Sequence, residues 1–558
     1  MLAGLITGFV AVGVGQFVAG IARPQGSPVA AVGSLAIDFT PPPVKNFAIS
    51  AFGSHDKFVL VSGVMVVLAI FAAVIGMYAM RHLGYGLAGL AVFAVIGLIA
   101  ALTRPNAELV DALPTLLGAA AGAFALVRLV GAARIALEAA GGPPRASAPR
   151  LDPFGPAAVE PAAMEDGTAA PVPDGTDTAV RPGGSGPMDP ERPPFVAGPP
   201  RPLVPLTARR SFLLNSSVAI AAGGVSLFAA RQLTERATAN IARSAVRLPA
   251  AARSAPPLPP GTNLDIRGLS PFITPNGAFY RVDTALIIPE VSTQDWQLRI
   301  HGMVEREINI SFAELLRRPL IEDYVTLTCV SNPVAGPYVG NARWLGASLA
   351  SLLRSARIRA GADQLLCSSS DGYTSGTPTE VILDGRDALL AIGMNGTALP
   401  FAHGFPVRMV TPGLYGYVSA TKWVTDIKVT TFGAETGYWA QRGWSQQAPI
   451  KTESRIDVPS SSVKAGQTPV AGVAWAQHKG IDAVHVRVDR GPWQQARLAA
   501  VPGIDTWRQW VWDWDATPGQ HTIEARATDA TGYTQTALQE PPEPNGATGY
   551  PSVTVTVT

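Results

Sequence analysis

The sequence predicts a multi-domain protein, in which an α-helical transmembrane bundle is followed by an α+β domain and then by a β-sandwich. Three observations support this order. Long uncharged segments fill the first 140 residues, a stretch rich in Pro and Gly comes next, and short alternating segments typical of strands make up the rest. Only 15% of the residues are charged and the mean hydropathy is positive, which is typical of a chain with membrane segments.

Residues 1–140 contain four apolar segments of about the length needed to cross a bilayer. The second and third are each followed by an arginine, Arg81 and Arg104. Core helices of a soluble protein are the alternative interpretation, but four such segments so close together favour the membrane. We therefore predict transmembrane helices at Leu2–Ala22, Phe58–Met80, Leu83–Thr103 and Ala112–Val130.

Residues 141–207 are dominated by Pro, Gly, Ala and acidic residues without apolar periodicity, which predicts a disordered linker. After it, Arg209-Arg210-Ser211-Phe212-Leu213 leads into an apolar stretch that runs to Ala230. This pattern resembles a twin-arginine export signal, a route that carries proteins already folded. An ordinary fifth span is the alternative. Residues 208–262 are thus predicted to form a signal-like fifth transmembrane helix and a connector.

The predicted topology follows from an arginine pair on the cytoplasmic side. The linker and the amino terminus then lie inside, and everything after Ala230 lies outside. The positive-inside rule gives mixed support, because Arg128 and Arg134 agree with this orientation while Arg231 and Arg236 do not. We predict a multi-pass protein of the cytoplasmic membrane, in contact with lipid, whose later domains face the periplasm or the cell exterior.

The soluble part begins near Gly261 with strand patterns at 296–302 and 308–310. Ser311 is predicted to cap a helix that runs through Leu316. The alternating segment 324–328 predicts a strand that delivers Cys329 at its end. A cysteine in such a place is often only a small buried apolar residue, and this is the simplest interpretation of Cys367 in its apolar strand.

Composition excludes several classes of function. The chain has two cysteines, too few for a disulfide framework, a cysteine-rich zinc site or a four-thiolate iron–sulfur cluster. The net formal charge is only +2, so no nucleic-acid surface is predicted. His55 and His82 are the only histidines before His301, and they cannot supply paired axial ligands for haem across a four-helix bundle.

The neighbourhood of Cys329 carries a resemblance to a known family. In order and spacing it is similar to the molybdopterin-binding domain of sulfite oxidase and its bacterial relatives, over about Leu264–Phe432, and we assign residues 263–433 to this catalytic domain. The segments that carry the resemblance are Thr326-Leu327-Thr328-Cys329-Val330-Ser331-Asn332, Gly340-Asn341-Ala342-Arg343-Trp344-Leu345-Gly346, Met394-Asn395-Gly396, His403-Gly404-Phe405-Pro406-Val407-Arg408 and Lys422-Trp423.

The resemblance implies a molybdenum–molybdopterin cofactor with one pterin, in which the Cys329 thiolate is a metal ligand. Soft sulfur donors suit a metal that changes oxidation state during oxygen-atom transfer. Tyr373 matches the position of an active-site tyrosine that could pass a proton. Four cationic residues are implied as ligands of the pterin phosphate, and two further residues are implied to contact the pterin: Arg281, His403, Arg408 and Lys422, then Asp371 and Thr421.

The sequence departs from sulfite oxidases where those enzymes bind the sulfite dianion. Pro333 and Val334 stand where an arginine is expected soon after the cysteine. The segments 418–420 and 546–549 stand where two further arginines are expected. A dianion without such cations pays heavily for its desolvation. We therefore expect a neutral oxygen-atom donor or acceptor, such as a sulfoxide, although a true sulfite oxidase remains an alternative.

Residues 450–558 contain short alternating strands, clearest at 484–488 and 522–527, and large apolar packing area is supplied by Trp493, Trp507, Trp510, Trp512 and Trp514. This pattern predicts an immunoglobulin-like sandwich, similar to the dimerisation domain that follows the molybdenum domain in this family. A homodimer is a corresponding expectation. A carbohydrate-binding module is the alternative, because exposed tryptophans also stack on sugars.

The sequence predicts no second redox centre. An external electron carrier is therefore implied, either a cytochrome or a quinone protein. The competing hypothesis from another functional class is a cofactor-free binding or scaffold protein that kept the fold. The presence of Cys329 together with His403, Arg408 and Lys422 favours the enzyme.

Overall fold

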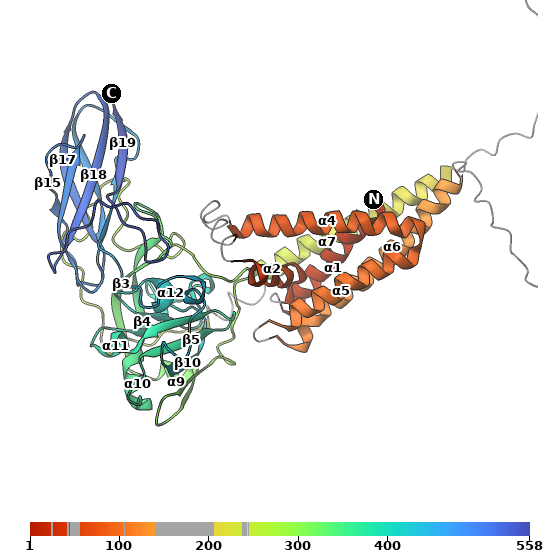
Figure 1. The fold of residues 1–558 in the computed structure, drawn as a ribbon, viewed down its shortest axis with the longest axis horizontal. Helices are drawn as coiled ribbons and strands as arrows, with labels where there is room; N and C mark the ends of the chain where they lie inside the picture. The colour runs from red at the N-terminus through yellow and green to blue at the C-terminus, as the bar shows by residue number, and fades with distance from the viewer. Residues whose placement is uncertain are drawn as a thin grey trace, which may run out of the picture.

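The computed structural model describes residues 1–23, 26–41, 44, 56–104, 107–139, 206–236, 243 and 245–558, and side chains are described in all but the ends of some helices. Figure 1 displays an elongated group of helices, in red to yellow, beside two regions rich in strands, in green and blue. The predicted linker falls almost wholly outside the described residues, as does His55.

Four of the helices are long and apolar enough to cross a membrane, and they match the four predicted spans. The structure adds α2 (Pro28–Phe39), which was not predicted, and a short 3₁₀ turn η3 (Leu109–Ala112). The helix predicted after the arginine pair is present as α7 (Leu206–Arg236), but its apolar part, Leu213–Ala229, is shorter than the four candidate spans. The four long helices are α1 (Leu2–Ala22), α4 (Asp56–Arg81), α5 (Leu83–Leu102) and α6 (Leu113–Ala139).

Small residues let these helices approach closely, as is usual for packing between membrane helices. A side chain at Gly4 would meet the backbone of α4 at Ala72 and Gly76. A side chain at Gly13 would lie 2.8 Å from the Gly223 carbonyl oxygen of α7. The first and last helices of this group are therefore direct neighbours.

The green region of Figure 1 contains two sheets that share one apolar core. The first sheet has the order β2-β1-β10-β5-β6, with β1 parallel to β10 and the other pairs antiparallel. Its strands are β1 (Gln297–Gly302), β2 (Ile308–Ser311), β5 (Gln364–Ser369), β6 (Thr374–Pro378) and β10 (Val424–Thr430).

The second sheet has the order β3-β4-β7-β8, with β9 paired to β7. It comprises β3 (Leu320–Thr328), β4 (Val339–Ser348), β7 (Leu389–Met394), β8 (Thr397–Ala398) and β9 (Arg408–Val410). Short helices connect the strands: α9 (Phe312–Leu316), α10 (Leu349–Ala356), α11 (Thr379–Leu383), η4 (Phe401–His403), α12 (Gly416–Ser419) and η5 (Ala440–Arg442).

The last part of the chain forms two sheets that face each other across a second core. One has the order β11-β13-β17-β16 and the other β12-β19-β18-β14-β15. Their strands are β11 (Glu453–Val458), β12 (Ser462–Val463), β13 (Gly466–Trp475), β14 (Ile481–Val488), β15 (Gln494–Gln495), β16 (Arg497–Leu498), β17 (Arg508–Ala516), β18 (Gly519–Asp529) and β19 (Ser552–Val557).

The two β-rich regions are joined by buried hydrogen bonds at β3. The backbone N–H of Trp507 donates to Thr326 Oγ1 at 2.7 Å, and Gln477 Nε2 donates to the Thr326 carbonyl at 3.0 Å. Trp507 and Trp475 pack in one cluster with Val330, just beyond Cys329. The last region therefore supports the strand that carries the candidate metal ligand.

Candidate active site around Cys329

Cys329 follows directly after β3, as predicted, and its side chain is buried. Its Sγ lies 2.9 Å from Ser331 Oγ, and it has no disulfide partner. Burial raises the pKa of the thiol, whereas the Ser331 hydrogen bonds and the positive charge of Lys422 act in the opposite direction. A single buried thiol held in this way can serve as a soft metal ligand, because a bound metal stabilises the thiolate.

A buried carboxylate, Asp283, joins two of the predicted cofactor residues. Lys422 Nζ lies 2.6 Å from Asp283 Oδ2, and Arg281 Nε lies 2.8 Å from the same oxygen. Burial lowers the pKa of Lys422 to about 8, although Asp283 favours its charged form. Lys422 also donates to the Ala402 carbonyl at 3.2 Å, so two segments far apart in the sequence meet at its side chain.

His403 and Arg408 enter the same cluster from the turn between η4 and β9. A side chain at Gly404, where φ is +106°, would lie 3.1 Å from Lys422 Cβ and 2.9 Å from Arg408 Cβ. Only glycine suits that conformation and that approach. Burial lowers the pKa of His403 to about 4, with Arg408 contributing, so the imidazole is neutral at pH 7 and its Nε2–H can donate to the Asn276 carbonyl at 3.0 Å.

Arg408 is buried and carries a charge that no carboxylate neutralises among its described contacts. Its guanidinium donates to the carbonyls of His403, Ala420 and Met409, and it lies 5.0 Å from the centre of the Trp344 ring. Burial lowers its pKa to about 10. A buried guanidinium beside Lys422 fits an anionic group such as a phosphate, because that group would supply the missing counter-charge.

Asp371 and Thr421 lie on the side of this cluster nearer to β6. Asp371 accepts hydrogen bonds from Thr284 Oγ1 at 3.3 Å and from the Tyr373 backbone N–H at 3.1 Å. Thr421 Oγ1 lies 2.6 Å from Ser375 Oγ and is fully buried. The predicted cofactor residues are thus brought together from four separate segments of the chain, with Cys329 on a fifth.

Tyr373 lies close to Cys329, but its proton is already engaged. Its phenol donates to the Tyr417 carbonyl at 2.5 Å. Burial raises its pKa well above the usual value, and the negative charges of Asp371 and Cys329 add to the effect. In this arrangement Tyr373 can accept a hydrogen bond from a ligand more readily than it can donate one.

Tyr280 is a site residue that the sequence reading missed. Burial raises the pKa of its phenol, and the next cause is the charge of Cys329, which places the two groups near each other. A side chain at Gly416 would lie 3.8 Å from the Tyr280 Oη and 3.6 Å from the carbonyl oxygen of Thr328. Among the described contacts, no protein group accepts a hydrogen bond from this phenol. In the sequence, only the position of Tyr280 directly before the predicted site residue Arg281 could have indicated that it belongs to the site.

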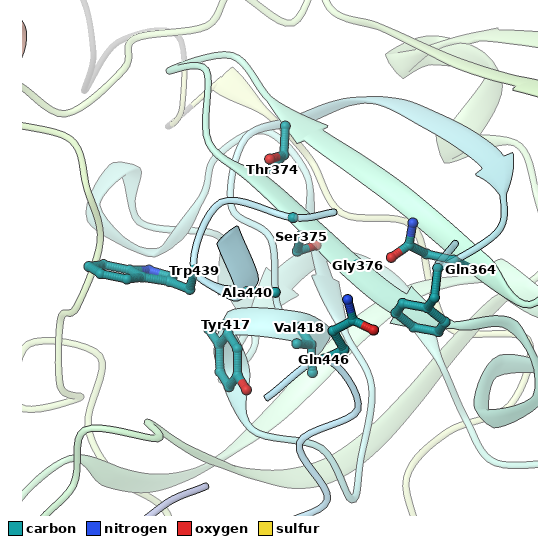
Figure 2. A pocket seen from close by; sticks show the side chains of 11 residues that line it. Gln364, Thr374, Ser375, Gly376, Tyr417, Val418, Trp439, Ala440 and Gln446 are labelled. Atoms are coloured by element: carbon teal, nitrogen blue, oxygen red, sulfur yellow. The ribbon is translucent and has the colours of Figure 1, made fainter. Parts of the chain in front are cut away.

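Asp283 was also missed, although it follows Arg281 by two residues. A carboxylate is unexpected in a phosphate pocket, and its contacts with Lys422 and Arg281 account for its place there. A shallow pocket borders the site from the side of β6 (Figure 2). It has about 220 Å³ of empty volume, open solvent included, and shares Ser375 with the hydrogen bond to Thr421.

The positions expected to hold dianion-binding arginines carry no cation. Pro333 and Val334 form an exposed to half-buried turn, closed by the Gly336 N–H to the Pro333 carbonyl. The segment 418–420 ends α12, and its Ala420 carbonyl is occupied by Arg408. Gly546 lies against the Tyr415 phenol.

The comparison with a family model identifies residues 285–439 as an oxidoreductase molybdopterin-binding domain. This segment contains Cys329 and all the predicted site residues except Arg281. Residues 285–439 are thus a domain of the sulfite-oxidase-like family of molybdopterin-dependent oxidoreductases. The predicted family assignment and the prediction of an oxidoreductase are therefore confirmed, and the immediate neighbours Tyr280 and Asp283 lie just outside the matched segment.

Sulfite-oxidase-like relatives differ in how much of their length they share with this chain. Chicken sulfite oxidase is 31% identical over 296 residues, which cover 44% of this chain and 63% of the relative. The uncharacterized oxidoreductase YuiH of Bacillus subtilis is 29% identical over 149 residues, 27% of this chain and 72% of the relative. The crystal structure of the sulfane dehydrogenase SoxCD from Paracoccus pantotrophus covers 51% of this chain and 84% of its own, at 24% identity and a TM-score of 0.45. The chain spans 63% of the chicken enzyme and 52% of the rat enzyme.

Proposed function

We propose that this protein is a membrane-anchored enzyme that transfers an oxygen atom at a molybdenum–molybdopterin centre with one pterin. The observation that carries the proposal is the buried Cys329 thiol, placed beside a cluster of buried cations within a molybdopterin-binding domain. When bound, the cofactor supplies a metal that changes oxidation state and exchanges an oxygen atom. The protein supplies the thiolate ligand, holds the cofactor in position and provides the protons for the reaction.

Each predicted site residue has a role in this proposal. Cys329 is the metal ligand. Arg281, Arg408 and Lys422 hold the pterin phosphate, and neutral His403 serves as a hydrogen-bonding partner. Asp371 and Thr421 contact the pterin.

The proposed substrate is neutral and holds a transferable oxygen, such as a sulfoxide, and the enzyme works in the reductive direction. Phenols rather than extra arginines surround Cys329, and a phenol can donate to a neutral S=O oxygen without a charge to compensate. We assign that donor role to Tyr280, with Tyr373 as the second phenol of the pocket. True sulfite oxidation is the second candidate, favoured by the names of the relatives.

The proposed setting is the cytoplasmic membrane, with the catalytic domain on the periplasmic or outer side. Four helices of sufficient length and apolarity support the anchor, and the Arg209-Arg210 motif supports twin-arginine export. The proposed domains are 1–140, 141–207, 208–262, 263–433 and 450–558. Electrons come from an external cytochrome or quinone protein, and the immunoglobulin-like last domain supports a homodimer.

The test is metal and pterin analysis of the purified full-length protein, produced in a host that makes the cofactor. We expect one molybdenum and one pterin per chain, without haem or iron–sulfur absorption. Cys329→Ser should lose turnover and most of its molybdenum while keeping the circular dichroism of the parent. A wild-type protein free of molybdenum would favour the scaffold hypothesis instead. Turnover with sulfite and an artificial acceptor, compared with dye-driven sulfoxide reduction, decides between the two substrates.

A further inference from the structure

A carboxyl group is buried at the start of the last domain without a partner for one of its oxygens. Glu453 is the first residue of β11, and only 5% of its surface is exposed. Its Oε1 makes no hydrogen bond within the described structure. Burial raises the pKa of Glu453 to about 8, although Lys451 favours the charged form. The carboxyl therefore carries its proton over most of the range below pH 8.

Tyr415 connects the last domain with the candidate active site, because it packs in one buried cluster with Val330, the residue after Cys329. It is buried, and among the causes that act on its pKa the backbone of Lys451 favours the ionised phenol. Its pKa lies well above the usual value, mainly through burial and then through the charges of Glu453 and Cys329, which places both groups near the phenol. The next residue, Gly416, lies against the carbonyl of Thr328, the residue before Cys329.

On its other side, Glu453 lines a pocket in the last domain. The pocket has about 200 Å³ of empty volume, with open solvent included. The residues that line it are Lys451, Thr452, Glu453, Tyr533, Gln535, Thr536, Ala547, Thr548 and Gly549. Lys451 Nζ donates to the Gly546 carbonyl at 2.6 Å, and a side chain at Gly546 would lie 2.4 Å from Tyr415 Oη. The backbone at Gly546, just before the lining residues 547–549, thus lies against the Tyr415 phenol.

We propose that Glu453 and Tyr415 form a proton route between the Cys329 centre and this pocket. The inference rests on the proposed function, because reduction of an oxygen-bearing substrate XO to X and water consumes two protons and two electrons. The electron carrier supplies the electrons. The route supplies the protons one at a time. Tyr415 passes its phenolic proton toward the centre and receives one from Glu453, directly or through one water, and Glu453 takes another proton from solvent in the pocket.

Other titratable groups lie around Glu453. Among the described residues, none of them forms an ion pair with its carboxyl group. Lys451 precedes it by two residues, and Tyr415 and Tyr533 lie near it from neighbouring segments. Asp529 of β18 accepts from Thr452 Oγ1 at 2.6 Å and lies 3.6 Å from Lys479 Nζ, so its charge is already partnered. Glu453 is thus the titrating carboxyl of this pocket near neutral pH.

The first test uses the molybdenum-loaded full-length protein in dye-driven sulfoxide reduction. Glu453→Gln keeps the shape but not the proton, so kcat should fall about tenfold or more at pH 7 while KM changes little. The wild-type kcat should fall as the pH rises through about 8, since the donor loses its proton there. This fall should be absent from the variant, and Glu453→Asp should restore part of kcat.

Glu524→Gln is the matched control in the same domain, because Glu524 is held by Arg487 at 2.7 Å on another strand. It should leave kcat and its pH profile unchanged. A second readout needs no turnover: the infrared carbonyl band of a protonated carboxyl should titrate near pH 8 in wild type and vanish in Glu453→Gln.

Molybdenum-loaded Glu453→Gln with the wild-type kcat and pH profile would overturn the route. If that variant does not fold, Tyr415→Phe decides, because it removes only the hydroxyl; an unchanged kcat then overturns the route as well. A missing carboxyl band in wild type overturns it even for a protein without metal. Absence of molybdenum with the band present counts against the proposed function alone.

Discussion

Two tyrosines near Cys329 differ in what their protons do. Tyr373 gives its proton to the Tyr417 carbonyl, while Tyr280 has no described acceptor in the protein. The phenols of Tyr373 and Tyr280 therefore differ in how they can hydrogen-bond to a ligand, although both lie near Cys329. The free donor is the one that can orient an uncharged oxygen.

Replacing Tyr280 by Phe should lower kcat/KM for a sulfoxide by about threefold to tenfold, since a net hydrogen bond is worth about 0.5–1.5 kcal/mol. Molybdenum content should not change. Tyr324→Phe is the control, because Tyr324 lies on β3 with Arg343 as its partner. Steady-state kinetics of the three proteins is the measurement. Equal kcat/KM in Tyr280→Phe and wild type would assign the phenol a packing role only.

Local rules account for the elements that the sequence predicted well. Ser311 caps α9 and Glu314 completes a capping box, so this short helix follows from four neighbouring residues. The strand before Cys329 begins four residues earlier than predicted, because Leu320 to Asp323 pair with β4 despite their mixed polarity. Cys367 is fully buried in β5, as expected.

What the sequence could not provide depends on distant contacts. Asp283 becomes part of the site only because Lys422, far along the chain, reaches it. Helix α2 is too short to be recognised as a span. It packs against α1, α4 and α5 and also reaches the catalytic domain at Gly33, where an added side chain would lie 2.9 Å from Leu286. The order of the motifs predicted which residues form the site. It did not predict which of their hydrogen-bond donors and charged groups are already paired with other protein groups.

Helix α7 is the element on which the proposed export depends. Replacing Arg209 and Arg210 by Lys should leave the catalytic domain on the cytoplasmic side while the first four helices still insert, because the twin-arginine route requires the arginine pair. Protease added to intact spheroplasts should then digest the wild-type domain and spare the variant. Equal digestion of both would mean that α7 is an ordinary span.

At the scale of the whole molecule, acidic groups gather where the two β-rich regions meet. Asp323 of β3 lies near Asp387 and Asp505, and burial raises its pKa to about 6, with both carboxylates contributing. The raised pKa means that the folded state binds the proton more tightly than the unfolded state. The contribution of Asp323 to the free energy of unfolding is therefore greatest at low pH and is lost as the pH rises from about 4 through about 6.

Asp323→Asn should raise the free energy of unfolding at pH 7 by about 1–2 kcal/mol, less than the full shift because the side chain is only half-buried. Asn can still accept the hydrogen bond from the Tyr324 N–H. At pH 4 the two proteins should unfold alike. Denaturant titrations of the soluble part at both pH values are the check, and a difference that does not depend on pH would show that Asp323 acts through packing alone.

The contact between Gly13 and Gly223 has a consequence for how the protein is assembled. More than two hundred residues separate these glycines in synthesis, so α1 leaves the ribosome long before its neighbour exists. If α7 is delivered by a route for folded proteins, the catalytic domain matures first and the helical group is completed last. We therefore expect α7, which packs this closely against α1, to stay in the mature protein after export.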